Sequence, residues 1–200
     1  MKQVEKGLIV LDAPISTYFP EAPASWKGIT VRQMLNHTSG IPNYTMADYK
    51  KVMDGDEAGL GTASMALPLD FVPGSRWSYS NTAYVMLGLL VRRVTGRFYG
   101  DVLVDEVFKP LGMPTARNIS EQEIIPQRAD GYEMKAGTLV NQGYVPPLLN
   151  STADGSLYMA LADYRAWDRA VNAGALLSAA SWAQIFKPVR LTSGRDVPYG

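Results

Sequence analysis

The sequence predicts an α+β fold that is mostly helical, and three observations support this prediction. Capping and stop residues bracket several short helices along the 200 residues. The run 82–91 places apolar residues on nearly every face of a helix, which is typical of a central, buried helix. Strand-like patterns are few and short, at 131–134, 138–140, 189–191 and 197–199.

The ends of the helices are placed by local signals. Thr30 and Gln33 form a Thr-x-x-Gln capping box. Ser80 or Asn81 caps the central helix, and Thr95-Gly96 stops it. Helices are expected at 1–7 (a helix end), 31–36, 45–52, 81–94, 99–108, 162–173 and 179–186, with an extended segment at 15–19 and a loop or weak helix at 54–68.

Composition excludes several classes of function. The net charge is zero, so no electrostatic argument favours nucleic acid or an anionic membrane. Cysteine is absent and His37 is the sole histidine, which excludes thiol catalysis and a His-rich metal site. No nucleotide-binding glycine motif occurs, so no cofactor is expected. The longest apolar run, 83–91, is far below the roughly 20 residues that span a bilayer.

The tripeptide Tyr79-Ser80-Asn81 is the main candidate for chemistry. It follows the turn Pro73-Gly74 and precedes the central helix, so it can aim two polar side chains into one cleft. From these residues alone, a tyrosine packed at a turn and an asparagine that caps a helix remain the alternative. His37 beside Ser39 suggests a general base, but no Gly-x-Ser-x-Gly elbow accompanies it, and we expect a structural role.

Several segments, taken in order, resemble the serine β-lactamase-like superfamily. This superfamily includes class C β-lactamases, D-alanyl-D-alanine carboxypeptidases and family VIII carboxylesterases. The most specific combination is Leu-x-His-Thr-Ser-Gly at 35–40, followed by Pro73-Gly74 and the tripeptide at 79–81. The segments that carry the resemblance are 7–15, 29–42, 73–74, 79–81, 110–113, 155–157, 163–174 and 197–200.

The resemblance implies that the chain is part of a larger fold. It would be the helical domain and adjoining part of a β-lactamase/transpeptidase-like fold, with most of the antiparallel sheet missing. We expect one partial domain over 1–200, with a helical subdomain at about 20–175. The ends 1–19 and 176–200 would lead to the missing sheet region. None of the lysines has a serine three positions earlier, and no Lys/His-Thr/Gly-Gly motif occurs, so we expect an internal fragment.

The family's mechanism implies roles for three residues. A serine Oγ attacks an ester or amide carbonyl after a base has taken its proton. Tyr79 matches the family's tyrosine base. An unperturbed tyrosine has a pKa of about 10, and a neighbouring ammonium charge lowers it. Asn81 matches the residue that binds the substrate's acyl-side amide. Tyr44 falls where some class C enzymes place a substrate-contacting residue.

We therefore expect a fragment of a serine hydrolase that acts on a small ester, β-lactam or D-amino-acid peptide. Without the serine and lysine, the chain alone should be inactive. One alternative is a non-catalytic β-lactamase-like binding or scaffold module. Another is a truncated product that self-associates through edges normally covered by the sheet. The compartment stays open, because family members include periplasmic, extracellular and cytoplasmic proteins.

Overall fold

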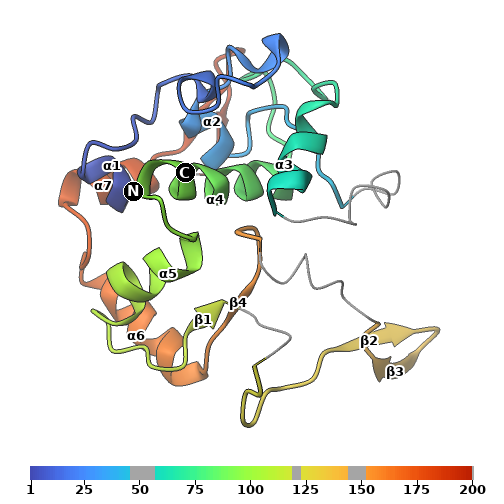
Figure 1. The fold of residues 1–200 in the computed structure, drawn as a ribbon, viewed down its shortest axis with the longest axis vertical. Coiled ribbons are helices and arrows are strands. Elements are labelled where there is room, and N and C mark those ends of the chain that lie inside the picture. The colour runs from blue at the N-terminus through green and yellow to red at the C-terminus, as the bar shows by residue number, and fades with distance from the viewer. Residues whose placement is uncertain (46–56, 119–122, 144–151, 200) are drawn as a thin grey trace.

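The computed structural model describes residues 1–45, 57–118, 123–143 and 152–199. The fold is α+β with helices dominating, as the sequence predicts (Figure 1). The helical elements are α1 (Lys2–Glu5), η1 (Ile15–Thr17), η2 (Ala24–Trp26), α2 (Val31–Leu35), α3 (Glu57–Met65), α4 (Asn81–Thr95), α5 (Tyr99–Leu103), the π-helical turn η4 (Val104–Phe108), α6 (Leu161–Asn172) and α7 (Ala179–Ile185). The strands are β1 (Arg117–Asn118), β2 (Tyr132–Lys135), β3 (Thr138–Asn141), β4 (Leu157–Tyr158), β5 (Val189–Arg190) and β6 (Asp196–Val197).

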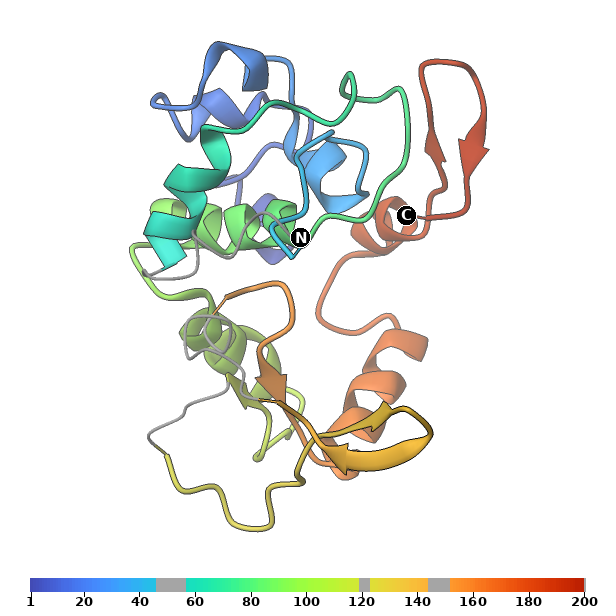
Figure 2. The ribbon, with the colours of Figure 1, turned by 90° about the vertical axis from the view of Figure 1, so that its right-hand side faces the viewer.

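Helix α4 runs through the middle of the molecule. Helices α2 and α3 pack on one side of it, while α5 and α6 lie on the other side together with β1 and β4 (Figures 1 and 2). In the described part of the chain the strands form three separate antiparallel pairs, β1–β4, β2–β3 and β5–β6. The β2–β3 hairpin lies on the same side of α4 as α6 but extends away from that helix (Figure 1), and β5–β6 stands beside α2 (Figure 2). Both hairpins fall where the sequence shows short strand-like patterns.

The helix ends are formed as the local signals predict. Thr30 Oγ1 accepts the Gln33 amide at 3.2 Å, and Gln33 Oε1 accepts the Thr30 amide at 3.0 Å, which completes the capping box. Ser80 is the N-cap of α4, because its Oγ accepts the Ala83 amide at 3.2 Å. Asn81 is therefore the first helical residue and not the cap. Gly96, at φ +70°, ends α4 in the left-handed conformation.

The hydrophobic core gathers on the α2 side of α4. Ala83, Met86 and Leu90 are fully buried there, which agrees with the apolar run seen in the sequence. Leu87 and Val91 are only partly buried and line an apolar hollow of about 450 Å³ between α4, α5 and α7. The core therefore covers one side of α4 more completely than the other.

One local prediction needs correction, and the structure decides between the two alternatives of another, in both cases because of distant contacts. Residues 15–17 form a 3-10 turn instead of an extended segment, because fully buried Ile15 donates its amide to Ile29 O at 2.8 Å. Residues 57–65 form the regular helix α3, which packs against α4. Gly61 permits this packing, since a Cβ there would lie 2.6 Å from Leu89 Cδ1. The helix expected at 45–52 falls almost wholly outside the described residues.

The two ends of the chain are bound to each other. The Glu5 carboxylate in α1 accepts the Ser178 amide at 2.7 Å and the Ser181 hydroxyl at 2.6 Å. These bonds, that from Ser181 first, lower the pKa of Glu5 to about 2. Lys2 Nζ also donates to Leu176 O at 3.2 Å. Among the described helices, none is long and apolar enough to cross a membrane.

Candidate active site

The two segments that carry the most specific sequence motifs lie against each other. Residues 37–44 follow α2, and residues 70–82 lead into α4. Three backbone hydrogen bonds join them: Asp70 N to Gly40 O at 2.9 Å, Gly74 N to Thr38 O at 2.8 Å and Ser78 N to His37 O at 3.0 Å. The turn that carries Tyr79 is thus fixed to the end of α2.

Gly40 is a glycine because no other residue fits this junction. Its φ is +77°, where a side chain is strained. A Cβ at this position would also lie 2.2 Å from the backbone oxygen of Phe71. The close approach of the two segments therefore depends on the missing side chain.

The same segment holds the first turn of α4. Asn43 Oδ1 accepts the backbone amide of Asn81 at 3.3 Å and its side-chain Nδ2 at 3.2 Å. The Tyr44 amide donates to Thr82 Oγ1 at 2.9 Å. No local sequence signal indicates Asn43, because its role depends on a contact across 38 residues. The side chain of Asn81 is consequently held in one orientation.

Tyr79 is half exposed and packs on one side against His37. Its side chain is 49% exposed, and its ring lies on the His37 imidazole with centroids 4.4 Å apart. The Tyr79 hydroxyl makes no hydrogen bond within the described part of the chain. The structure therefore places Tyr79 and Asn81 at one turn, as predicted, with the phenol directed away from the core.

His37 lies at the centre of an aromatic group. It is 1% exposed, and its ring is near Tyr84 (5.0 Å), Tyr199 (5.2 Å) and Trp77 (6.1 Å) as well as Tyr79. Burial lowers the pKa of His37 to about 4. Among the described residues no carboxylate bonds to the imidazole, so the structure forms no Ser-His-Asp arrangement around it.

Tyr44 reaches this corner but is buried within it. Its side chain is 4% exposed, and its hydroxyl donates to Asp154 Oδ2 at 2.6 Å. Burial, followed by that carboxylate, raises the pKa of Tyr44. Little of its surface can therefore meet a ligand in this arrangement.

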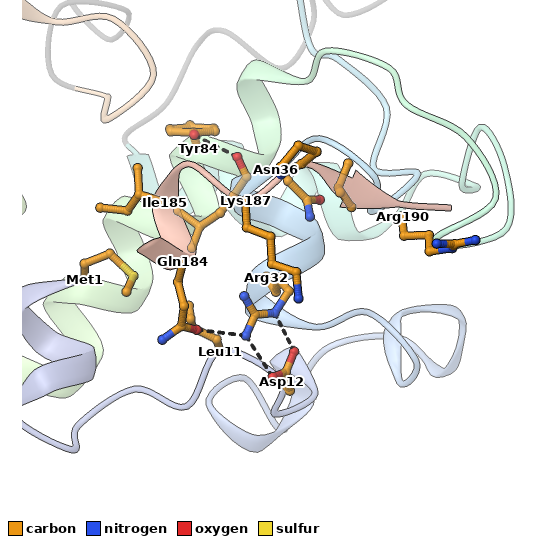
Figure 3. A pocket seen from close by; sticks show the side chains of 13 residues that line it. Met1, Leu11, Asp12, Arg32, Asn36, Tyr84, Gln184, Ile185, Lys187 and Arg190 are labelled. Carbon is orange, nitrogen blue, oxygen red and sulfur yellow. Dashed lines mark hydrogen bonds and ion pairs between the residues drawn. The ribbon is translucent and has the colours of Figure 1, made fainter. Parts of the chain in front are cut away.

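A cavity of about 630 Å³ adjoins the aromatic group (Figure 3). Tyr84 lines it and also stacks on His37, so the two features share one side chain. At the other end Arg32 binds Asp12 through two bonds of 2.7 and 2.9 Å and reaches Gln184 at 3.2 Å (Figure 3). Neither Tyr79 nor Asn81 lines this cavity. Within the described ranges, no three acidic or histidine side chains are grouped to hold a metal ion.

Comparison with known proteins identifies the family of the chain. The sequence model of the family described as Beta-lactamase matches residues 1–198. Penicillin-binding protein 4* of Bacillus subtilis (strain 168) is 29% identical over 213 aligned positions, which cover 98% of this chain and 47% of that protein.

Two solved structures have a similar fold over most of this chain. The D-stereospecific amidohydrolase from Streptomyces sp. superposes with a TM-score of 0.82 at 27% identity, covering 96% of this chain and 62% of that one. The D-amino acid amidase from Ochrobactrum anthropi SV3, complexed with L-phenylalanine amide, gives 0.79 at 28%, covering 94% and 56%. The chain thus spans less than two thirds of each of these three proteins. By sequence and fold together, the chain belongs to the Beta-lactamase family.

Proposed function

We propose that this chain supplies the tyrosine–asparagine side of a serine hydrolase site that works through an acyl-enzyme. The observation that carries the proposal is the half-exposed phenol of Tyr79, held beside Asn81 by hydrogen bonds from residues 37–44. A general base needs this combination of a fixed position and an open approach.

In the proposed reaction, a serine Oγ bonds to the substrate carbonyl carbon while Tyr79 takes the hydroxyl proton. The tetrahedral intermediate then breaks its bond to the leaving group, which receives that proton from Tyr79. Water then attacks the acyl-enzyme carbonyl carbon while Tyr79 takes a proton from it, and the serine leaves with that proton, which releases the acid. A lysine ammonium near Tyr79 would favour its phenolate form, and the family's Ser-x-x-Lys motif provides such a lysine.

Asn81 would bind the acyl-side amide of the substrate. Its Nδ2 already donates one hydrogen bond to Asn43, which orients the amide plane. The second N–H and the carbonyl oxygen remain to pair with a substrate amide, which has one acceptor and one donor. For Tyr44 we propose a smaller part: its bond to Asp154 helps to hold residues 37–44 beside the start of α4.

The names of the compared proteins favour one substrate class. One is a D-stereospecific amidohydrolase and another is a D-amino acid amidase. Within the group of esters, β-lactams and D-amino-acid peptides, we therefore favour an amide of a D-amino acid. The pocket contacts that select it depend on side chains beyond this chain's described site.

The first test uses the 200-residue chain itself. It contains no Ser-x-x-Lys, so we expect no hydrolysis of nitrocefin, p-nitrophenyl butyrate or D-phenylalanine amide. Steady turnover by the pure chain, abolished by Tyr79→Phe, would overturn the proposal.

The second test uses a longer form with a Ser-x-x-Lys segment ahead of Met1. There Tyr79→Phe should lower kcat by about 10²–10⁴, the usual contribution of a general base. Tyr132→Phe is the matched control, because Tyr132 is also exposed but lies in the β2–β3 hairpin. Equal kcat for the two variants would exclude the role of Tyr79. Labelling of the longer form by a fluorophosphonate would exclude the purely non-catalytic module.

A further inference from the structure

The backbone of His37 occupies a position that normally belongs to glycine. Helix α2 ends in a Schellman motif, in which Thr38 N donates to Gln33 O at 2.8 Å and His37 N donates to Met34 O at 3.4 Å. The residue at this point must be left-handed, and His37 has φ +59°. At the end of α4 the chain uses Gly96 for the same conformation. A side chain makes this conformation less favourable, although less so for His and Asn than for most residues, whereas glycine adopts it freely.

The side chain of His37 has a second unfavourable feature. Its Nε2 is buried and has no hydrogen-bond partner among the residues that the structure describes. Native proteins pair most buried polar atoms, so an exception calls for an explanation. An unfavourable backbone conformation and an unpaired polar atom in one residue together indicate that the His37 side chain has a role in its contacts with neighbouring residues.

What the imidazole holds is the turn that carries Tyr79. The Ser80 amide donates to His37 Nδ1 at 3.2 Å, and the Tyr79 ring packs against the same imidazole, with centroids 4.4 Å apart and planes tilted by 37°. One side chain thereby fixes two consecutive residues, one through its backbone and one through its ring. The surrounding rings of Trp77, Tyr84 and Tyr199 keep the imidazole in place.

We propose that His37 is a positioning residue that orients Tyr79 for proton transfer by binding the Ser80 amide and supporting the phenol ring. This inference rests on the proposed function of Tyr79. It assigns His37 no contact with substrate.

The chemistry of the contact defines the state of the ring. A backbone amide can only donate, so Nδ1 is the unprotonated nitrogen and Nε2 carries the hydrogen. The pKa of about 4 keeps the imidazole neutral at physiological pH, so it serves as a fixed acceptor and not as the proton carrier. The titratable side chains that face it are Tyr79, Tyr84 and Tyr199.

The structural part of the test uses the 200-residue chain and needs no activity. His37 is the sole histidine, so imidazole nitrogen signals in an NMR spectrum belong to it alone. We expect an unprotonated Nδ1 and a protonated Nε2. His37→Gly should raise hydrogen exchange at the Ser80 amide by about tenfold or more, since that amide loses its partner. Gln127→Gly is the matched control, because exposed Gln127 has the same φ of 59° and should leave Ser80 unchanged.

The functional part uses the longer form with the Ser-x-x-Lys segment. His37→Gly should lower kcat by about 100-fold with KM changed less than about threefold, as expected when a catalytic group is misplaced and not removed. His37→Asn tolerates the left-handed backbone and keeps an acceptor, so it should restore Ser80 protection but only part of kcat. If His37→Gly fails to fold, His37→Asn alone tests the support of the phenol ring: a protected Ser80 amide with lowered kcat agrees with that role, and unchanged kcat refutes it.

The outcomes separate the two proposals. If Ser80 exchange in His37→Gly equals that of the unsubstituted chain, or if kcat does not change, the positioning role of His37 is refuted. If Tyr79→Phe leaves kcat unchanged while Ser80 exchange still depends on His37, the proposed function fails and the structural link stands. Loss of kcat in His37→Gly without any change in Ser80 exchange also refutes positioning through the Ser80 amide.

Discussion

Replacing Gly40 with alanine tests whether residues 37–44 and 70–82 are locked together as the structure shows. The alanine Cβ would lie 2.2 Å from Phe71 O, whereas real contacts of this kind stay above 3.0 Å. The two segments would therefore have to separate by at least 0.8 Å, the difference of these values. Such a movement also breaks the 2.9 Å bond from Asp70 N to Gly40 O.

The expected loss of stability can be worked out from three contributions. The left-handed backbone costs an alanine roughly 1–2 kcal/mol, the lost hydrogen bond about 1 kcal/mol and the overpacking about 1–3 kcal/mol. Gly40→Ala should thus lower the free energy of unfolding by about 3–6 kcal/mol. Gly96→Ala is the matched control: its φ is +70°, but nothing lies within 4 Å of the added Cβ. It should lose only the first contribution.

Urea unfolding followed by the fluorescence of the four tryptophans measures this difference. With a slope of about 2 kcal/mol per molar urea, the midpoint of Gly40→Ala should lie about 1 M or more below that of Gly96→Ala. Midpoints that agree within about 0.3 M would show that the clash is relieved at no cost. The locking of the two segments would then be refuted.

Three further predictions concern single side chains. Folding lowers the pKa of His37 from 6.5 to about 4, so the unfolded chain binds more protons between these pH values. The free energy of unfolding should therefore keep its full value above about pH 6.5 and fall by at most about 3 kcal/mol as the pH drops to about 4. A pH-stability profile that is equally steep in His37→Asn would contradict it. Thr30→Ala should lose about 1 kcal/mol of stability through the capping box, while exposed Thr192→Ala should not, and equal losses in urea melts would count against the cap. Tyr44→Phe should cost about 1 kcal/mol by removing the bond to Asp154, and an unchanged midpoint would show that this bond contributes nothing.

Local rules predict the helix ends because those ends satisfy their own backbone groups. The roles of Thr30 with Gln33, of Ser80 and of Gly96 each depend on residues within four positions, and all three agree with the structure. The mostly helical fold and the positions of the short strands also follow from local signals. The family resemblance supplies Tyr79 and Asn81, which the residues alone leave open.

The site itself could not be worked out from local patterns. Asn43 and His37 act on the start of α4 across 38 and 43 residues, and no periodicity encodes such pairs. The left-handed backbone of His37 was also hidden, because the residue there is not glycine. The turn at Ile15 escaped prediction for the same reason, since its partner Ile29 lies in another segment.

The attachment of α1 to α7 has a consequence for the order of folding. The bonds of Glu5 to Ser178 and Ser181 join positions 173 and 176 residues apart. Closing a flexible loop of this length costs roughly 4–5 kcal/mol of entropy, which is recovered only after the intervening helices have shortened the distance. The first helix of the chain should therefore dock last, after α4 and its neighbours have formed. Late protection of the Ser178 amide in refolding monitored by hydrogen exchange would reveal this order, and early protection would exclude it.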